Sequence, residues 1–268
     1  MKEITINSWS DFDKLVTRKN YRKWLFRGQS NYTWSLQSSL SRCFHDSEQI
    51  KKVREVSKTI SSYYEHELVM LDKFRCHAHL YLKNLPSKDD TLSWLCLMQH
   101  YGAPTRLLDF TFSPYVALYF ALEAGTGDAA VYLVNHDALI EDDVDTFDGE
   151  PELAYKALFE RNAGVECLFS FEPKFSNERL LAQQGLLVAP NNLELTHELI
   201  LESYKCKESD FIKARIPGKL RYSGLRKLNQ MNINAANIYP GLEGFCRSLN
   251  KQPILGVQWQ KRLGGNVL

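Results

Sequence analysis

The stretch from Gln99 to Leu122, QHYGAPTRLLDFTFSPYVALYFAL, constrains the fold more than any other part of the chain. A Gly-Ala-Pro turn ends one helix, and Ser113-Pro114 begins another, because serine is a favoured N-cap and proline fits the first helical turn. Between them, His100, Arg106 and Asp109 lie too close together for a simple buried helix, and the apolar residues are too dense for a surface loop. Two interpretations stay open, a polar network that pins a loop to the core and a binding site.

The rest of the chain predicts helices and strands in roughly equal measure. Apolar residues at helical spacing, caps and breakers predict helices at 11–16 with Ser8 or Ser10 as N-cap, 47–82 as one long helix or two joined ones, 91–99, 224–231 and 242–249. Aromatic and β-branched runs predict strands at 24–30, 129–134, 170–171, 184–188, 198–201 and 211–216, the last half-exposed because it alternates apolar and basic residues. The mixture predicts an α+β fold and excludes a doubly wound βαβ alternation.

The 268 residues favour a single domain, 1–268, with a helical insertion at about 47–100. No apolar run approaches the ~20 residues of a membrane-spanning helix, and the N-terminus does not resemble a signal peptide. The six cysteines stand singly with no C-x-x-C pair, as expected for reduced thiols. We therefore expect a cytoplasmic protein without a membrane association.

Charge is nearly balanced overall, at a formal +1, but it is unevenly placed along the chain. Residues 141–152 contain seven acids and no Lys or Arg, which predicts a solvated loop. The span between Asp210 and Glu243 carries six cations and no acid, and Tyr222 lies among them. This basic segment is either a footprint for a phosphate backbone or an ordinary solvated face.

The sequence lacks the motifs of several common classes of enzyme. No G-x-G-x-x-G or G-x-x-x-x-G-K phosphate loop occurs, and no G-x-S-x-G nucleophile turn is found. Cys76 and His79 would share a helix face, but a third metal ligand is not evident, so we expect no metal site. These observations argue against kinases, Rossmann dehydrogenases, P-loop ATPases and triad hydrolases.

Arg27-Gly28 remains as the strongest candidate for ligand binding. Placed at the end of an aromatic strand, Arg27 can match phosphate or carboxylate oxygens two at a time, and Gly28 lets a ligand approach the backbone. A structural ion pair of Arg27 with an acid is the alternative interpretation.

Taken together, these residues resemble the FRG-domain family, named for the triplet that stands here as Phe26-Arg27-Gly28. The resemblance covers roughly residues 20–245, and its further motifs are Gln29, Trp34-x-Leu36, Ser38-x-Leu40, Phe74-Arg75, Gln99-His100-Tyr101-Gly102-x-Pro104-Thr105-Arg106-Leu107-Leu108-Asp109-x-Thr111-x-Ser113-Pro114-x-x-Ala117-Leu118-Tyr119-Phe120-Ala121, Arg179-x-x-x-Gln183-Gln184-Gly185 and Tyr239-Pro240-Gly241-Leu242-x-Gly244.

A weaker resemblance links the chain to mono-ADP-ribosyltransferases of the Arg-Ser-Glu type. That family has an aromatic-Arg-Gly strand, then a Ser-Thr-Ser strand leading into a helix with an A-x-x-F-A pattern, then a strand with a catalytic Glu. Residues 26–28, 109–121 and 183–188 are similar in order and type. The resemblance implies a split β core with an inserted helical block and NAD as substrate. Gln183 and Gln184 stand where that family has its glutamate.

The resemblance also implies roles for individual residues. Arg27, Gly28, Gln29, His100 and Arg106 would bind NAD, with Arg27 on the phosphates or the adenosine ribose. Asp109, Thr111 and Gln184 would form the catalytic group, in which Thr111 braces the nicotinamide ribose. Either Asp109, Glu178 or another acid replaces the glutamate, or the site binds a nucleotide without turning it over.

The function implied is that of an NAD-dependent ADP-ribosyltransferase-like toxin or defence effector that modifies RNA or protein. A toxin of this kind would be accompanied by a neutralising antitoxin protein. The alternatives are an NAD hydrolase, a non-catalytic module that senses a nucleotide or docks a partner, and a purely structural interaction domain.

Overall fold

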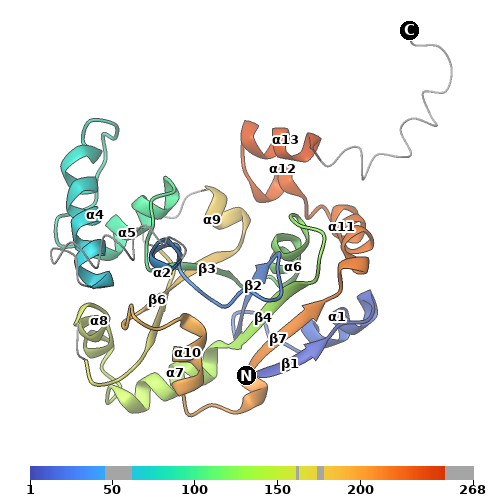
Figure 1. Cartoon of the computed structure of the whole chain (residues 1–268), viewed down its shortest axis with the longest axis horizontal. Coiled ribbons are helices and arrows are strands. Elements are labelled where there is room, and N and C mark those ends of the chain that lie inside the picture. The colour runs from blue at the N-terminus through green and yellow to red at the C-terminus, as the bar shows by residue number, and fades with distance from the viewer. Residues whose placement is uncertain (46–61, 161–162, 174–177, 251–268) are drawn as a thin grey trace, which may run out of the picture.

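The computed structural model describes residues 1–45, 62–160, 163–173 and 178–250. A seven-stranded open sheet crosses the molecule in the order β1-β7-β4-β2-β3-β6-β5 (Figure 1). The strands are β1 (Lys2–Thr5), β2 (Trp24–Gln29), β3 (Leu108–Thr111), β4 (Ala129–Asn135), β5 (Leu168–Phe171), β6 (Gly185–Pro190) and β7 (Phe211–Ile216). β1 pairs in parallel with β7, and the other neighbours are antiparallel, so the sheet is mixed. The α+β prediction is confirmed.

Helices surround this sheet. They are α1 (Trp9–Val16), α2 (Ser39–His45), α4 (Tyr63–Ala78), α5 (Thr91–His100), α6 (Pro114–Leu122), α7 (His136–Thr146), α8 (Pro151–Phe159), α9 (Glu178–Ala182), α10 (His197–Ser203), α11 (Arg221–Gln230), α12 (Ala235–Ile238) and α13 (Leu242–Leu249), with short 3-10 turns at Glu208–Asp210 and Gly218–Leu220. None of the helices within the described residues is long and apolar enough to cross a bilayer.

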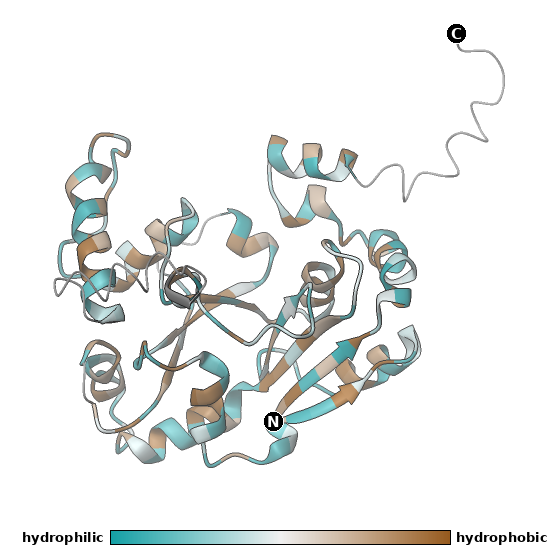
Figure 2. Cartoon of the chain, in the orientation of Figure 1, coloured by the Kyte–Doolittle hydropathy of each residue, from teal (hydrophilic) through white to brown (hydrophobic). Residues whose placement is uncertain are grey.

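Two hydrophobic layers cover the faces of the sheet. On one face α1, α6 and α11 pack on β2, β4 and β7, and at the β6 end of that face α4, α5 and α8 form a separate cluster around Leu187 and Ala189. On the other face α7 and α10 pack against Phe110, Tyr132 and Val188. Hydrophobic residues are accordingly concentrated on the central strands and on α6 (Figure 2).

The boundaries predicted around α1, α5 and α6 are confirmed by their caps. Ser8 accepts a hydrogen bond from the Asp11 backbone N–H at the start of α1, and Ser113 caps α6 in the same way with Pro114 in the first turn. Asp90 caps α5. The predicted helix at 47–82 falls partly outside the described residues; within them it is α4, which ends at Ala78, four residues before the predicted end.

Three predictions about local structure are wrong. Residues 141–152 are not a solvated loop, because Asn135 caps α7, Pro151 begins α8, and the Asp143 carboxylate packs inside to accept a hydrogen bond from Tyr204. Residues 198–201 are helical, since Thr196 supplies an N-cap for α10. β7 is not half-exposed: it lies between β1 and β4, and Lys213 is buried.

Candidate functional site

β2 and β3 separate, and the separation opens a cavity in the sheet. β2 pairs with β4 through all six of its residues but with β3 only at Phe26 opposite Thr111. The other edge of β3 pairs with β6 along its whole length. A cavity of about 760 Å³ lies at the split, and side chains from both faces of the sheet line it, including Arg27 from one face and Asp109 from the other.

The sequence predicted Arg27 at the end of its strand, but the residue lies within β2. Its Nη1 donates to the Asp109 backbone carbonyl at 2.6 Å, across the gap where ladder bonds are missing. Its Nε is buried and has no hydrogen-bond partner. Burial lowers the pKa of Arg27, whereas the Asp109 carboxylate raises it. A half-buried guanidinium that lines a cavity and is fixed by a backbone carbonyl is suited to an anionic ligand.

Two further arginines, Arg42 of α2 and Arg179 of α9, line the same cavity. Arg42 donates to the Gln37 carbonyl at 2.7 Å, and the Arg179 guanidinium lies 5.0 Å from the centre of the Tyr239 ring. Three arginines from separate elements therefore surround the cavity, against two acids, Asp109 and Glu123. This balance favours a ligand with negative charge.

The two acids have different partners. The Asp109 carboxylate accepts a hydrogen bond from Gln99 Nε2 at 2.9 Å, and Gln99 is held in turn by the Thr105 hydroxyl at 2.5 Å. Glu123 accepts a hydrogen bond from the Tyr239 hydroxyl at 2.9 Å. Asp109 is thus oriented by an amide that leaves its second oxygen available.

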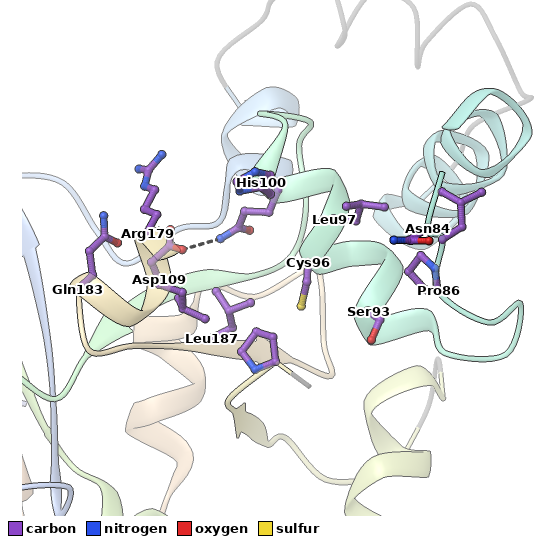
Figure 3. Close-up of a pocket in the computed structure, with 14 residues that line it drawn as sticks. Asn84, Pro86, Ser93, Cys96, Leu97, His100, Asp109, Arg179, Gln183 and Leu187 are labelled. Atoms are coloured by element: carbon purple, nitrogen blue, oxygen red, sulfur yellow. Dashed lines mark hydrogen bonds between the residues drawn. The ribbon is translucent and has the colours of Figure 1, made fainter. Parts of the chain in front are cut away.

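A second, more apolar cavity of about 380 Å³ adjoins the first. Asp109, Arg179 and Gln183 line both cavities. Figure 3 shows these three side chains at one end of the second cavity and Asn84, Pro86 and other α5-side residues at the opposite end. Asp109 is therefore at the junction of a charged space and an apolar one.

Gly28 has a packing role that the sequence did not indicate. A Cβ at this position would lie 1.8 Å from the Ala117 carbonyl oxygen and 2.6 Å from the Ala121 nitrogen. Glycine is therefore required for α6 to pack directly on β2, whichever ligand the cavity holds. The neighbouring Gln29 is buried in the cavity wall, where its Nε2 donates to the Ser35 carbonyl at 3.2 Å while its Oε1 has no partner.

Thr111 and Gln184 do not present free polar groups to the cavity. The buried Thr111 hydroxyl donates to the Gln183 carbonyl at 2.6 Å and accepts from the Ser113 N–H, so it ties β3 to the segment before β6. Gln184 is exposed, has a positive φ of 48° and lies outside the lining of both cavities. Gln183 is the glutamine in the wall, and its Nε2 donates to the Ile238 carbonyl.

Arg106 is separated from the other predicted binding residues. It is only 3% exposed and forms an ion pair with Glu67 of α4, which is also buried. Its Nη1 donates to the Leu158 carbonyl at 2.7 Å. Arg106 is outside the lining of both cavities, and these contacts pin the loop before β3 to α4 and α8. His100, in contrast, lines the apolar cavity.

The basic segment is not a continuous exposed stripe. Lys213 is buried 3.7 Å from Glu198, Arg215 pairs with Asp128, and the buried Arg221 donates to backbone carbonyls. Two of the six cations are thus buried and a third is paired with an acid at the surface, which weakens the electrostatic argument for RNA. Among the described residues no group of three or more His, Cys, Asp or Glu side chains is arranged to hold a metal ion.

The site contains residues that sequence reasoning did not assign to it. Arg179 and Gln183 belong to a motif that had been recognised, but their positions in the wall follow from the pairing of β6 with β3. Arg42 had no signal at all, because its approach depends on how α2 folds back over the split.

A family described as the FRG domain matches residues 22–129, which span β2, β3 and α6 and end at the first residue of β4. No curated protein matches the chain, and no solved structure does.

Proposed function

Residues 22–129 of this chain are an FRG domain, and from that premise we propose that the protein is an NAD-dependent ADP-ribosyltransferase that modifies a macromolecule. The single observation that carries the proposal is the Arg27 guanidinium, which lines the cavity where β2 and β3 part and is held there by the bond from its Nη1 to the Asp109 carbonyl. Such a donor, fixed before the ligand arrives, needs no reorganisation to bind an anion.

The composition of the cavity fits a dinucleotide. Arg27, Arg42 and Arg179 can share the two negative charges of a diphosphate. Trp34, Phe120 and Tyr239, the aromatic residues of the wall other than Phe26 and Phe110, offer surfaces for bases. A volume of about 760 Å³ is within the roughly 300–1,000 Å³ of ordinary ligand pockets.

The order of elements supports the same proposal. The Arg-Gly strand is β2, the strand that runs directly into a helix is β3 before α6, and the third strand is β6, paired with β3. The separation of β2 from β3 corresponds to the split core that the resemblance to Arg-Ser-Glu transferases implies. If the protein is a transferase, NAD is its substrate and binds across the gap between β2 and β3.

Asp109 is the acid that we assign in place of the family's glutamate. Transfer breaks the bond between the ribose carbon and the nicotinamide nitrogen, the electron pair leaves with nicotinamide, and the acceptor supplies the new pair. Asp109 would stabilise the positive charge that develops on the ribose, and its carboxylate is oriented by Gln99. Thr111 and Gln184 would have no direct part, given their positions.

The biological role proposed is that of a toxin or defence effector, with a neutralising antitoxin protein as partner and with RNA or protein as acceptor. A second candidate is a nucleotide-sensing module without catalysis. It is favoured by one observation: Gln183, a neutral amide, stands in the wall where the family has a glutamate. NAD hydrolysis requires the same binding residues and no acceptor.

The test is incubation of the purified protein with NAD labelled in its adenosine part, alone and with total RNA or cell protein. Wild type is compared with Arg27→Lys, Arg27→Ala and Asp109→Asn, and with Arg18→Ala as a control on the exposed surface. We expect the Arg27 variants to lose NAD binding and Asp109→Asn to keep binding but lose turnover. NAD that binds to wild type and stays intact with every acceptor would establish a sensor instead.

A further inference from the structure

The apolar cavity beside the arginine-lined one has no role in the scheme above. It is bounded by α5, α9, β6 and the segment before α5, and it opens toward the dinucleotide cavity at Asp109 and Arg179. The larger cavity already contains arginines for a diphosphate and aromatic surfaces for both bases. A dinucleotide therefore does not need the second space.

The shared wall determines what a group in the apolar cavity can reach. Asp109 and Gln183 line both spaces, so a molecule entering the apolar cavity meets the acid that we place beside the reacting ribose carbon. A nucleophile arriving from this side would face the reaction centre without displacing the dinucleotide. The position is that of a second-substrate site.

The remaining walls decide the class of the second substrate. Among the described residues that line the apolar cavity, Arg179 is the only one with a permanent positive charge. This arginine is shared with the larger cavity and also lies against Tyr239. Six of the lining residues are apolar: Leu85, Pro86, Leu97, Pro173, Leu180 and Leu187. A phosphate backbone would find no basic groove here, whereas an aliphatic or aromatic amino-acid side chain would bury its surface favourably.

We infer that the apolar cavity binds the acceptor and that the acceptor is a protein, with an apolar side chain close in sequence to the modified residue. The inference rests on the proposed function. The acceptor's nucleophile bonds to the ribose carbon as the bond to nicotinamide breaks, and its proton passes to Asp109 or to water. Specificity then comes from the fit of the neighbouring side chain in the cavity.

The test uses substitutions that fill the apolar cavity or place a charge in it. Transfer of label to an acceptor and binding of NAD are then measured separately. Leu97→Trp reduces the cavity volume, and Leu85→Asp places a charge at its more exposed margin. Leu68→Trp, on the exposed side of α4 and outside both cavities, is the matched control. Labelled NAD is the probe; NAD affinity, nicotinamide release without acceptor, and label transfer to cell protein and to total RNA are measured for each variant.

We expect both cavity variants to bind NAD within about twofold of wild type and to lose at least about tenfold in transfer to protein, while the control transfers normally. Equal loss of NAD binding would assign the cavity to the nucleotide and overturn the inference. Unchanged transfer, or label found on RNA, would also overturn it and leave the transferase standing. If wild type neither binds nor consumes NAD, both proposals fail together.

Discussion

At the scale of single residues, chemically similar side chains have opposite roles in this protein. Arg106 is buried and is neutralised by Glu67, whereas the half-buried Arg27 lines a cavity and donates to a backbone carbonyl. The difference is in the neighbours: a buried arginine with a carboxylate against it is a structural ion pair. One without such a partner is available to a ligand.

Arg106→Met should destabilise the protein by about 3–5 kcal/mol, because Glu67 would remain as a buried, uncompensated charge. The double variant Arg106→Met with Glu67→Met should recover a large part of that loss, since neither charge remains. Urea unfolding of the two single variants and the double one measures the cycle. If the double variant were as unstable as the sum of the singles, the pair would not be coupled and the structural role would be wrong.

His197 predicts a specific pH dependence of stability. Burial, with a smaller contribution from the Arg27 charge, lowers the pKa of His197 to about 3. In the unfolded chain, His197 has the ordinary histidine pKa of about 6.5 and is protonated below that pH, whereas in the folded protein it stays neutral. The free energy of unfolding therefore falls as the pH decreases from about 6.5 to about 3. Between pH 7 and 5 the loss from this group is about 2 kcal/mol.

His197→Gln removes this titration, so its free energy of unfolding should fall less between pH 7 and 5 than that of wild type. Asp143 has its pKa raised to about 6 by burial and works in the opposite direction, but it is present in both proteins and cancels in the difference. Parallel pH dependences for the two proteins in denaturant titrations would contradict the assignment.

At the scale of elements, the contact of α6 with β2 determines the shape of the site. α6 lies directly on β2 at Gly28, and β3 precedes it by only two residues, so the helix and the two strands are positioned together. The Arg27 side chain spans the split between β2 and β3 by donating to the Asp109 carbonyl, and the other edge of β3 is fixed by its pairing with β6.

Gly28→Ala should destabilise the protein by about 1–3 kcal/mol, toward the upper end because the added methyl meets backbone atoms of α6 that cannot rotate away. Gly127→Ala is the matched control, since a Cβ there has no neighbour within 4 Å; we expect less than about 0.5 kcal/mol. Thermal and urea unfolding compare the two. If the two variants were equally stable, the packing of α6 on β2 would not require glycine at position 28.

At the scale of the whole molecule, the site depends on segments far apart in the chain. The family match ends at residue 129, but Arg179, Gln183 and Tyr239 of the cavity wall lie beyond it. Arg221 of α11 links these regions, because its guanidinium donates to carbonyls of Ala121, Leu122, Ala124, Gly127 and Ser30. It therefore fixes the rim where β2, α6 and the loop before β4 meet.

Arg221→Met should lower stability by at least about 2 kcal/mol, because several buried carbonyls lose their donor. Amide hydrogen exchange should increase most in segments 28–32 and 121–128, and least in β5 and β6. Arg226→Met, on the exposed side of the same helix, should change neither quantity. Uniform acceleration over the whole chain would show that Arg221 acts on global stability without holding the rim.

The sequence by itself determined the local elements: the capped starts of α1 and α6, the extent of α5, the buried strand β4, and the candidacy of Arg27 and Asp109. These depend on side-chain and backbone preferences within a few residues, which a sequence states directly. It could not assign 198–201 to a helix, because an apolar run that short fits either structure and the Thr196 cap decided it.

Only the tertiary structure decided which polar side chains meet. It paired Arg106 with Glu67, used the Thr111 hydroxyl on the Gln183 carbonyl, left Gln184 outside and brought Arg42 and Arg179 to the cavity. Each outcome depends on contacts between residues distant in the chain, and a buried charge takes whichever opposite partner the fold brings within reach. The spacing of residues along the sequence therefore does not predict which partner a buried polar side chain has.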